Sequence, residues 1–131
     1  MKLFQQKNHV GIVLRRIKTE IPTFDDLQVP NALANLSMAK RGLIIIVGAT
    51  GTGKSSTLAA MIGQRNRKSR GHIITVEDPI EYVHQNKKAV IKQREIFADT
   101  HSFAEALKRC LRQDPDVIVV GEMRDLETIS T

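Results

Sequence analysis

Residues 48–55 have the types and spacing of a phosphate-binding loop. Their sequence, GATGTGKS, matches G-x-x-x-x-G-K-[ST] and follows an apolar run at residues 43–47. Glycines let backbone N–H groups surround an anion, and a helix that begins after the loop directs its positive end at phosphate. Lys54 would neutralise the β- and γ-phosphates, and the Ser55 hydroxyl would be a ligand for Mg²⁺. The expected nucleotide contacts are Gly48, Ala49, Thr50, Gly51, Thr52, Gly53, Lys54, Ser55 and Ser56.

The alternative to a nucleotide site is an ordinary glycine-rich turn. The flanking pattern disfavours it, because a β-branched run precedes the loop and a helix-like segment, residues 55–62, follows it.

Glu122 follows the apolar run at residues 117–120, where a Walker B acid is expected, although the usual Asp directly after the run is here Gly121. A carboxylate at this position would orient or deprotonate the attacking water, or hold a water bound to Mg²⁺. Alternatively, Glu122 and Asp125 are simply favourable acids in the first turn of a helix.

Three more acids, Glu77, Asp78 and Glu81, leave the apolar run at residues 72–76. The carboxyl ends of parallel strands share one edge of a sheet, so these acids could reach the same crevice. Ordinary turn chemistry beside Pro79 is the alternative.

The elements that must position these residues alternate between strand and helix. Periodicity and caps predict the following order: a strand at 10–17; short helices from 23 and from 30 to 38; a strand at 43–47; a helix to about 64; a strand at 72–76; a weaker strand at 89–91; a helix opened by a capping box at 102–105; and a strand at 116–120. The fold class is therefore α/β, with a parallel sheet and the ligand at the strand tips.

Composition excludes several classes of protein. The 131 residues have no apolar run near the ~20 residues of a membrane span and no signal peptide, which predicts a cytoplasmic protein without direct membrane insertion. The single cysteine, Cys110, falls on the apolar side of a helix, and the four histidines lack metal-ligand spacing.

The net charge is +6, but the densest basic group, residues 65–70, lies at a helix end, where cations complement the dipole. We therefore expect no nucleic-acid partner.

Together these segments resemble the secretion-ATPase superfamily, and within it the type IV pilus retraction ATPases of the PilT/PilU type. Residues 48–55 resemble Walker A, residues 74–81 the aspartate box and residues 119–125 Walker B; residues 93–95, 111–116 and 124–128 are also similar to this family. Residues 48–53 and 71–74 are more like PilU, and residues 121–125 are more like PilT, so the choice between the two stays open.

The resemblance implies a P-loop NTPase with a RecA-like core that hydrolyses ATP with Mg²⁺ to power pilus retraction and twitching motility. It implies a homo-hexamer, peripheral at the inner-membrane base of the pilus, whose partners are related retraction ATPase subunits and the inner-membrane pilus platform protein. The implied catalytic residues are Lys54, Glu81 and Glu122, and the implied metal-site residues are Ser55 and Glu122. Arg15 and Arg16 would contact nucleotide across a subunit boundary, unless they are simply exposed on a strand edge.

The resemblance also implies a domain order and an incomplete core. Residues 1–20 would end an upstream domain, residues 21–41 would be a linker with short helices, and residues 42–131 would be part of the ATPase core. The family's later core strands, its histidine motif and its C-terminal helical domain have no counterpart here. We therefore expect a fragment that keeps the phosphate-binding geometry but lacks the parts for ring assembly and efficient turnover.

Two other functions are compatible with a phosphate-binding loop. A P-loop kinase would need a lid and an acceptor pocket, and the sequence indicates neither; a GTPase would need an Asn-Lys-x-Asp motif, which is absent. A fragment that binds nucleotide without turnover is the remaining alternative.

Overall fold

The computed structural model describes residues 2–14, 16–123 and 126–130. Arg15, and Arg124 and Asp125 of the Walker B segment, lie outside the described residues. None of the helices in the described part of the chain is both long and apolar enough to cross a lipid bilayer.

The centre of the fold is a three-stranded parallel sheet in the order β4–β3–β5. Its strands are β3 (Gly71–Glu77), β4 (Ala89–Glu95) and β5 (Val117–Val120). The middle strand β3 is buried from Ile73 to Val76, as expected for an apolar strand with neighbours on both sides. The predicted α/β class with a parallel sheet is confirmed, and all three strands deliver their carboxyl ends to one edge.

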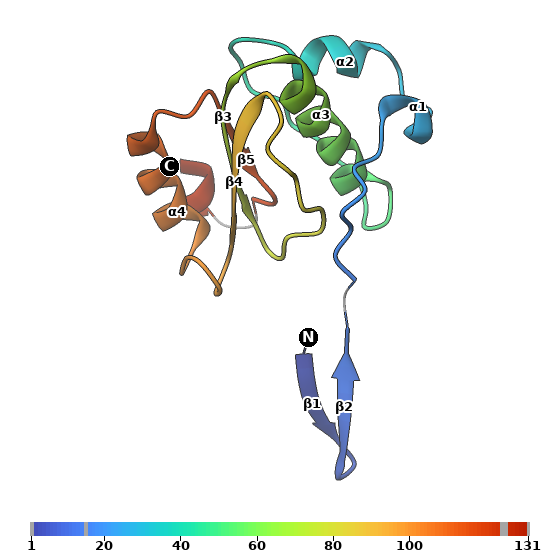
Figure 1. The fold of residues 1–131 in the computed structure, drawn as a ribbon. Coiled ribbons are helices and arrows are strands. Elements are labelled where there is room, and N and C mark those ends of the chain that lie inside the picture. Colours follow the sequence, from blue (N-terminus) through green and yellow to red (C-terminus); the bar gives the residue numbers. More distant parts are fainter. Residues whose placement is uncertain (1, 15, 124–125, 131) are drawn as a thin grey trace.

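One long helix and one shorter helix cover the two faces of this sheet (Figure 1). The long helix α3 (Lys54–Lys68) packs through Leu58 and Ile62, and α4 (Phe103–Cys110) packs through Ala106 and Cys110. Alternate strand residues point to opposite faces. Those on the α3 face are Ile73, Ala89, Ile91, Val117 and Val119; those on the α4 face are Ile74, Val76 and Ile118.

Two short helices, α1 (Phe24–Leu27) and α2 (Ala32–Ser37), cover the side of α3 that faces away from the sheet. The predicted cap at Thr23 is confirmed, because its hydroxyl accepts from the Asp26 N–H while the Asp26 carboxylate accepts from the Thr23 N–H at 2.8 Å. Phe24 packs against Ala60 and Met61 of α3. Helix α3, which begins at the end of the phosphate loop, is therefore covered on both sides.

Helix α4 begins with only half of the capping box predicted from the sequence. The Ser102 hydroxyl accepts from the Glu105 N–H, but the Glu105 carboxylate pairs with Arg109 one turn further along. A 3-10 turn (Leu111–Gln113) then ends the helix before Pro115, and the last helix, α5 (Leu126–Ser130), contacts α4. Cys110 is fully buried, as its place on the apolar face predicts.

The N-terminal segment is a hairpin that projects away from the sheet (Figure 1). Strands β1 (Lys2–Gln6) and β2 (His9–Val13) pair antiparallel around Lys7 and Asn8, which both have left-handed φ angles, 46° and 63°. The sequence prediction of one strand over residues 10–17 was wrong in its extent and missed β1. A two-residue turn of this kind favours Asn but usually also contains Gly, and its absence weakened the signal.

The strand predicted at residues 43–47 does not form. Within the described residues this segment joins no β-ladder, and Leu43 and Val47 are 79% and 86% exposed. Only Ile46 packs against the cluster between α2 and α3. The composition favours a strand, but a strand also needs a neighbour to pair its N–H and C=O groups, and no described segment pairs with residues 43–47.

Candidate functional site

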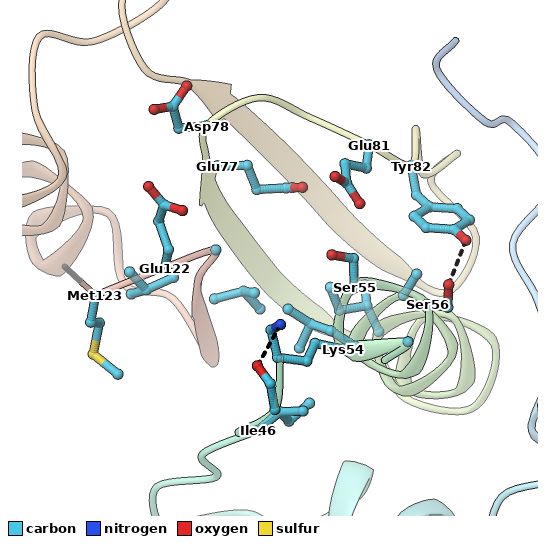
Figure 2. Close-up of a pocket in the computed structure, with 18 of the residues that line it drawn as sticks. Ile46, Lys54, Ser55, Ser56, Glu77, Asp78, Glu81, Tyr82, Glu122 and Met123 are labelled. Carbon is cyan, nitrogen blue, oxygen red and sulfur yellow. Dashed lines mark hydrogen bonds between the residues drawn. The ribbon is translucent and has the colours of Figure 1, made fainter. Parts of the chain in front are cut away.

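A cavity of about 860 Å³ lies between the phosphate loop, the start of α3 and the carboxyl edge of the sheet (Figure 2). This volume falls within the range of small-molecule sites. Its lining includes most of the predicted site residues: Gly48, Thr50, Gly51, Gly53, Lys54, Ser55, Ser56, Glu77, Asp78, Glu81 and Glu122. Ala49, Thr52 and Arg16 do not line it.

The phosphate loop has the backbone shape that its glycines permit. Gly51 and Gly53 have φ angles of 82° and 91°, and residues that carry a Cβ rarely adopt such angles. Gly53 is also the N-cap of α3, so no side chain there satisfies the first-turn N–H groups of the helix. The start of α3 therefore presents backbone donors and the positive end of the helix dipole to the cavity.

The Lys54 ammonium is held by the loop that it follows. Its Nζ donates to the carbonyls of Gly48 and Ala49, both at 2.8 Å, and the Thr52 hydroxyl donates to the same Ala49 carbonyl at 2.8 Å. Ala49 and Thr52 thus shape the loop although they do not line the cavity. An anion that reached Lys54 would compete with two neutral carbonyls for a full positive charge, and charge-assisted bonds are the stronger ones.

The acids meet opposite the loop, and they come from two strand ends. Figure 2 shows Glu77, Glu81 and Glu122 around the space beyond Lys54 and Ser55, while the Asp78 carboxylate points away from Lys54. The structure therefore brings Glu77, at the end of β3, and Glu81, in the loop after it, together with Glu122, which follows β5; Asp78 lines the cavity but its carboxylate is turned away (Figure 2).

Gly121 explains why the usual Asp is missing directly after β5. Its N–H donates to the Val76 carbonyl at 2.8 Å, and a Cβ built on it would lie 3.2 Å from the Glu77 Cα. The chain passes so close to β3 that a side chain would force the two backbones apart. The first acid after the strand is therefore Glu122.

Gln93, which the sequence matched to the family but did not assign to the site, connects the residues of the acidic edge. Its amide N–H₂ donates to Glu77 Oε1 at 3.1 Å and to the Tyr82 carbonyl at 2.8 Å, and its Oε1 accepts from the His84 N–H. The Thr75 hydroxyl also donates to Glu77 Oε1, at 2.6 Å. A signal was present: polar residues continue the weak strand predicted at 89–91, and the register sets Gln93 beside Thr75.

His84 lies at the rim of the cavity in an environment that disfavours its charged form. Burial, and then the positive charge of Arg67, lower the pKa of His84 from 6.5 to about 4. The folded protein therefore keeps this imidazole neutral between pH 4 and pH 6.5, whereas the unfolded chain protonates it.

We predict that this histidine makes the fold acid-sensitive. Because the unfolded state binds the extra proton, stability should be lost as the pH falls from about 6.5 to about 4, by roughly 2 kcal/mol after allowance for partial exposure. Urea unfolding at pH 7 and pH 4 measures the loss. His84→Gln should reduce it by that amount, and His9→Gln on the exposed hairpin should not; equal losses in the two variants would contradict the assignment.

Within the described residues, no three His, Cys, Asp or Glu side chains are arranged to hold a metal ion by themselves.

Comparison with known proteins identifies the family. The model of the family described as "Type II/IV secretion system protein" matches residues 8–131. The chain is 60% identical over 126 residues to the type IV pilus ATPase PilU of Pseudomonas aeruginosa and 48% identical over 126 residues to that organism's type IV pilus retraction ATPase PilT. These matches cover 96% of this chain but 33% and 37% of the relatives.

A solved structure agrees with the sequence relatives. The crystal structure of the pilus retraction motor PilT with bound ADP superposes with a TM-score of 0.94 at 52% identity, covering 98% of this chain and 37% of that one. This chain thus spans about a third of the length of the proteins it matches. The protein belongs to the type II/IV secretion system protein family, in which pilus ATPases of the PilU and PilT kind are its relatives.

Proposed function

We propose that this chain binds ATP with Mg²⁺ in the cavity and contributes to the ATP hydrolysis that powers type IV pilus retraction and twitching motility. One observation carries the proposal: Lys54 and Ser55, at the start of α3, share a single cavity with Glu81 and Glu122 from the opposite edge. The names of the relatives, and the ADP bound to the PilT structure, support this choice of nucleotide and process.

Phosphate binding follows from the loop and the helix start. The N–H groups of the first turn of α3 would donate to phosphate oxygens, and the glycines of residues 48–53 would let the backbone approach them. The Lys54 ammonium would exchange its two carbonyl acceptors for the β- and γ-phosphate oxygens. The remaining proposed contacts are those of Ala49, Thr50, Thr52 and Ser56.

The residues present suit Mg²⁺. This cation prefers oxygen ligands and is bound through substrate phosphates and water rather than by an all-protein cage, in keeping with the lack of a three-ligand cluster among the described residues. Ser55 would supply a hydroxyl ligand, and Glu122 would hold the metal through water. Bound there, the metal would neutralise charge on the phosphates.

Two acids are proposed to act on the attacking water. Glu122 would orient or deprotonate it, and Glu81 would assist from the loop after β3. Glu77 is assigned a different role, because Thr75 and Gln93 both donate to its Oε1 and hold it within the sheet edge. It would keep the edge in shape rather than move a proton.

Assembly and location are proposed from the family alone. The intact protein would be a homo-hexamer at the cytoplasmic side of the inner membrane, in contact with related retraction ATPase subunits and the pilus platform protein. Residues 1–20, 21–41 and 42–131 would be the end of one domain, a linker and a partial core, with Arg15 and Arg16 at the subunit boundary. A nucleic-acid partner is not proposed, since Arg65 of the basic group donates to the carbonyls of Ser37 and Ala39.

Calorimetric titration of the purified chain with ATP tests the proposal. In the presence of Mg²⁺ we expect one site per chain; chelation by EDTA should weaken ATP binding about tenfold, because phosphate charge then faces the acids unshielded. ATP binding whose affinity is the same with and without Mg²⁺, or no ATP binding at all, would contradict the proposal.

A further inference from the structure

The segment between the hairpin and α1 is attached to the loop that follows β3. The Lys18 N–H donates to the Glu81 carbonyl at 3.0 Å, and the Val83 N–H donates to the Lys18 carbonyl at 2.9 Å. Lys18 and Tyr82 thereby form an isolated parallel bridge. Because the same loop carries Glu81, residue 18 is hydrogen-bonded directly to the backbone of an acid that lines the cavity.

The Tyr82 side chain extends this attachment to α3. Its ring is buried, with 7% of the residue exposed, and its hydroxyl lies 2.8 Å from Ser56 Oγ (Figure 2). The Lys18 ammonium donates to the same hydroxyl at 3.3 Å and lies 5.2 Å from the ring centroid. A phenol hydroxyl can accept from Lys18 and still bond with Ser56, because it has one donor and two acceptor positions.

The hydroxyl therefore joins three parts of the protein that are distant in sequence: the segment before α1, the loop that carries Glu81, and the first turn of α3. Ser56 follows Ser55 directly, so the third contact lies one residue from the proposed metal ligand. A change at the start of α3 on nucleotide binding would reach Lys18 through one buried side chain.

We propose that Tyr82 is a positioning residue that couples nucleotide binding at α3 to the docking of Lys18 on the loop after β3. This inference rests on the proposed function, because it needs a nucleotide in the cavity. Coupling is reciprocal: a nucleotide that orders the first turn of α3 strengthens the docking of Lys18, and a docked Lys18 strengthens nucleotide binding by the same factor. Two hydrogen bonds to one hydroxyl correspond to a factor of about five to ten.

Amide hydrogen exchange followed by NMR, with MgADP as the probe, tests this coupling. The Lys18 and Val83 N–H groups report docking. The internal reference is the Ala106 N–H of α4, on the far face of the sheet, which donates to the Ser102 carbonyl. In the unchanged chain, saturating MgADP should slow exchange at Lys18 and Val83 at least fivefold relative to Ala106. In Tyr82→Phe, which keeps the ring, MgADP should still bind but the selective slowing should vanish.

Variants of Ser56 separate coupling from packing. Because Ser56 is also a proposed nucleotide contact, each variant is compared at an MgADP concentration that saturates it. Ser56→Ala should then also abolish the slowing, and Ser56→Thr, which keeps the hydroxyl, should retain it. Unchanged Ala106 protection shows that a variant is folded. The inference is overturned if MgADP slows exchange equally in Tyr82→Phe, or binds the unchanged chain without slowing it. If MgADP does not bind the unchanged chain, the proposed function fails and this inference with it.

Discussion

Replacing Lys54 with alanine should lower the affinity of the chain for MgATP by about 100-fold. Among the described residues that line the cavity, Lys54 is the one lysine or arginine, and losing a charge-assisted contact to phosphate costs about 3 kcal/mol. Equilibrium binding of a fluorescent ATP analogue measures the change. Because Lys54 also bonds the Gly48 and Ala49 carbonyls, circular dichroism must accompany the titration.

Lys40→Ala is the matched control, since it removes the same charge from an exposed position before the loop. It should change affinity less than twofold. If Lys40→Ala and Lys54→Ala weakened binding equally, the effect would reflect net charge, and the loop would not be the phosphate site.

Replacing Glu122 with glutamine should slow ATP cleavage by about 1,000-fold and leave MgATP affinity within about threefold. The amide keeps the size of the side chain and can still accept from a metal-bound water, but it cannot take a proton, and a general base contributes roughly 10²–10⁴ to a rate. Single-turnover cleavage of γ-labelled ATP, with the chain in excess, measures this step without requiring ring assembly.

Glu77→Gln is the informative comparison, because this acid lines the same cavity but is already held by Thr75 and Gln93. It should disturb stability more than cleavage. Cleavage that survives in Glu122→Gln and disappears in a folded Glu77→Gln would reverse the roles assigned to these two residues.

Much of this site was predictable because its signals are local. The glycine spacing of residues 48–53 marks the loop, and each acid lies within five residues after an apolar run that became β3 or β5. Helix starts at Thr23 and Ser102 were equally local, since a capping hydroxyl bonds within its own turn.

The sequence predictions failed where the structure depends on interactions between distant segments. Residues 43–47 have the composition of a strand, yet pairing depends on a neighbour that no local pattern reveals. Tyr82 and Gln93 act through partners 9 to 64 residues away, and their local sequence does not name those partners, although the polar residues that continue the weak strand at 89–91 hinted at Gln93. The buried Asn66 is a similar case, because its side chain donates to the Gln85 carbonyl and accepts from the Lys87 N–H. In the sequence, Asn66 is simply one more polar residue near a basic helix end.

The most direct test of the central claim is a crystal structure of this chain with a non-hydrolysable MgATP analogue. We expect phosphates against the first-turn N–H groups of α3, the Lys54 ammonium moved from the Gly48 and Ala49 carbonyls onto phosphate oxygens, and Ser55 and Glu122 on the two sides of the metal. An analogue bound elsewhere, or bound in the cavity with Lys54 still on its two carbonyls, would contradict it.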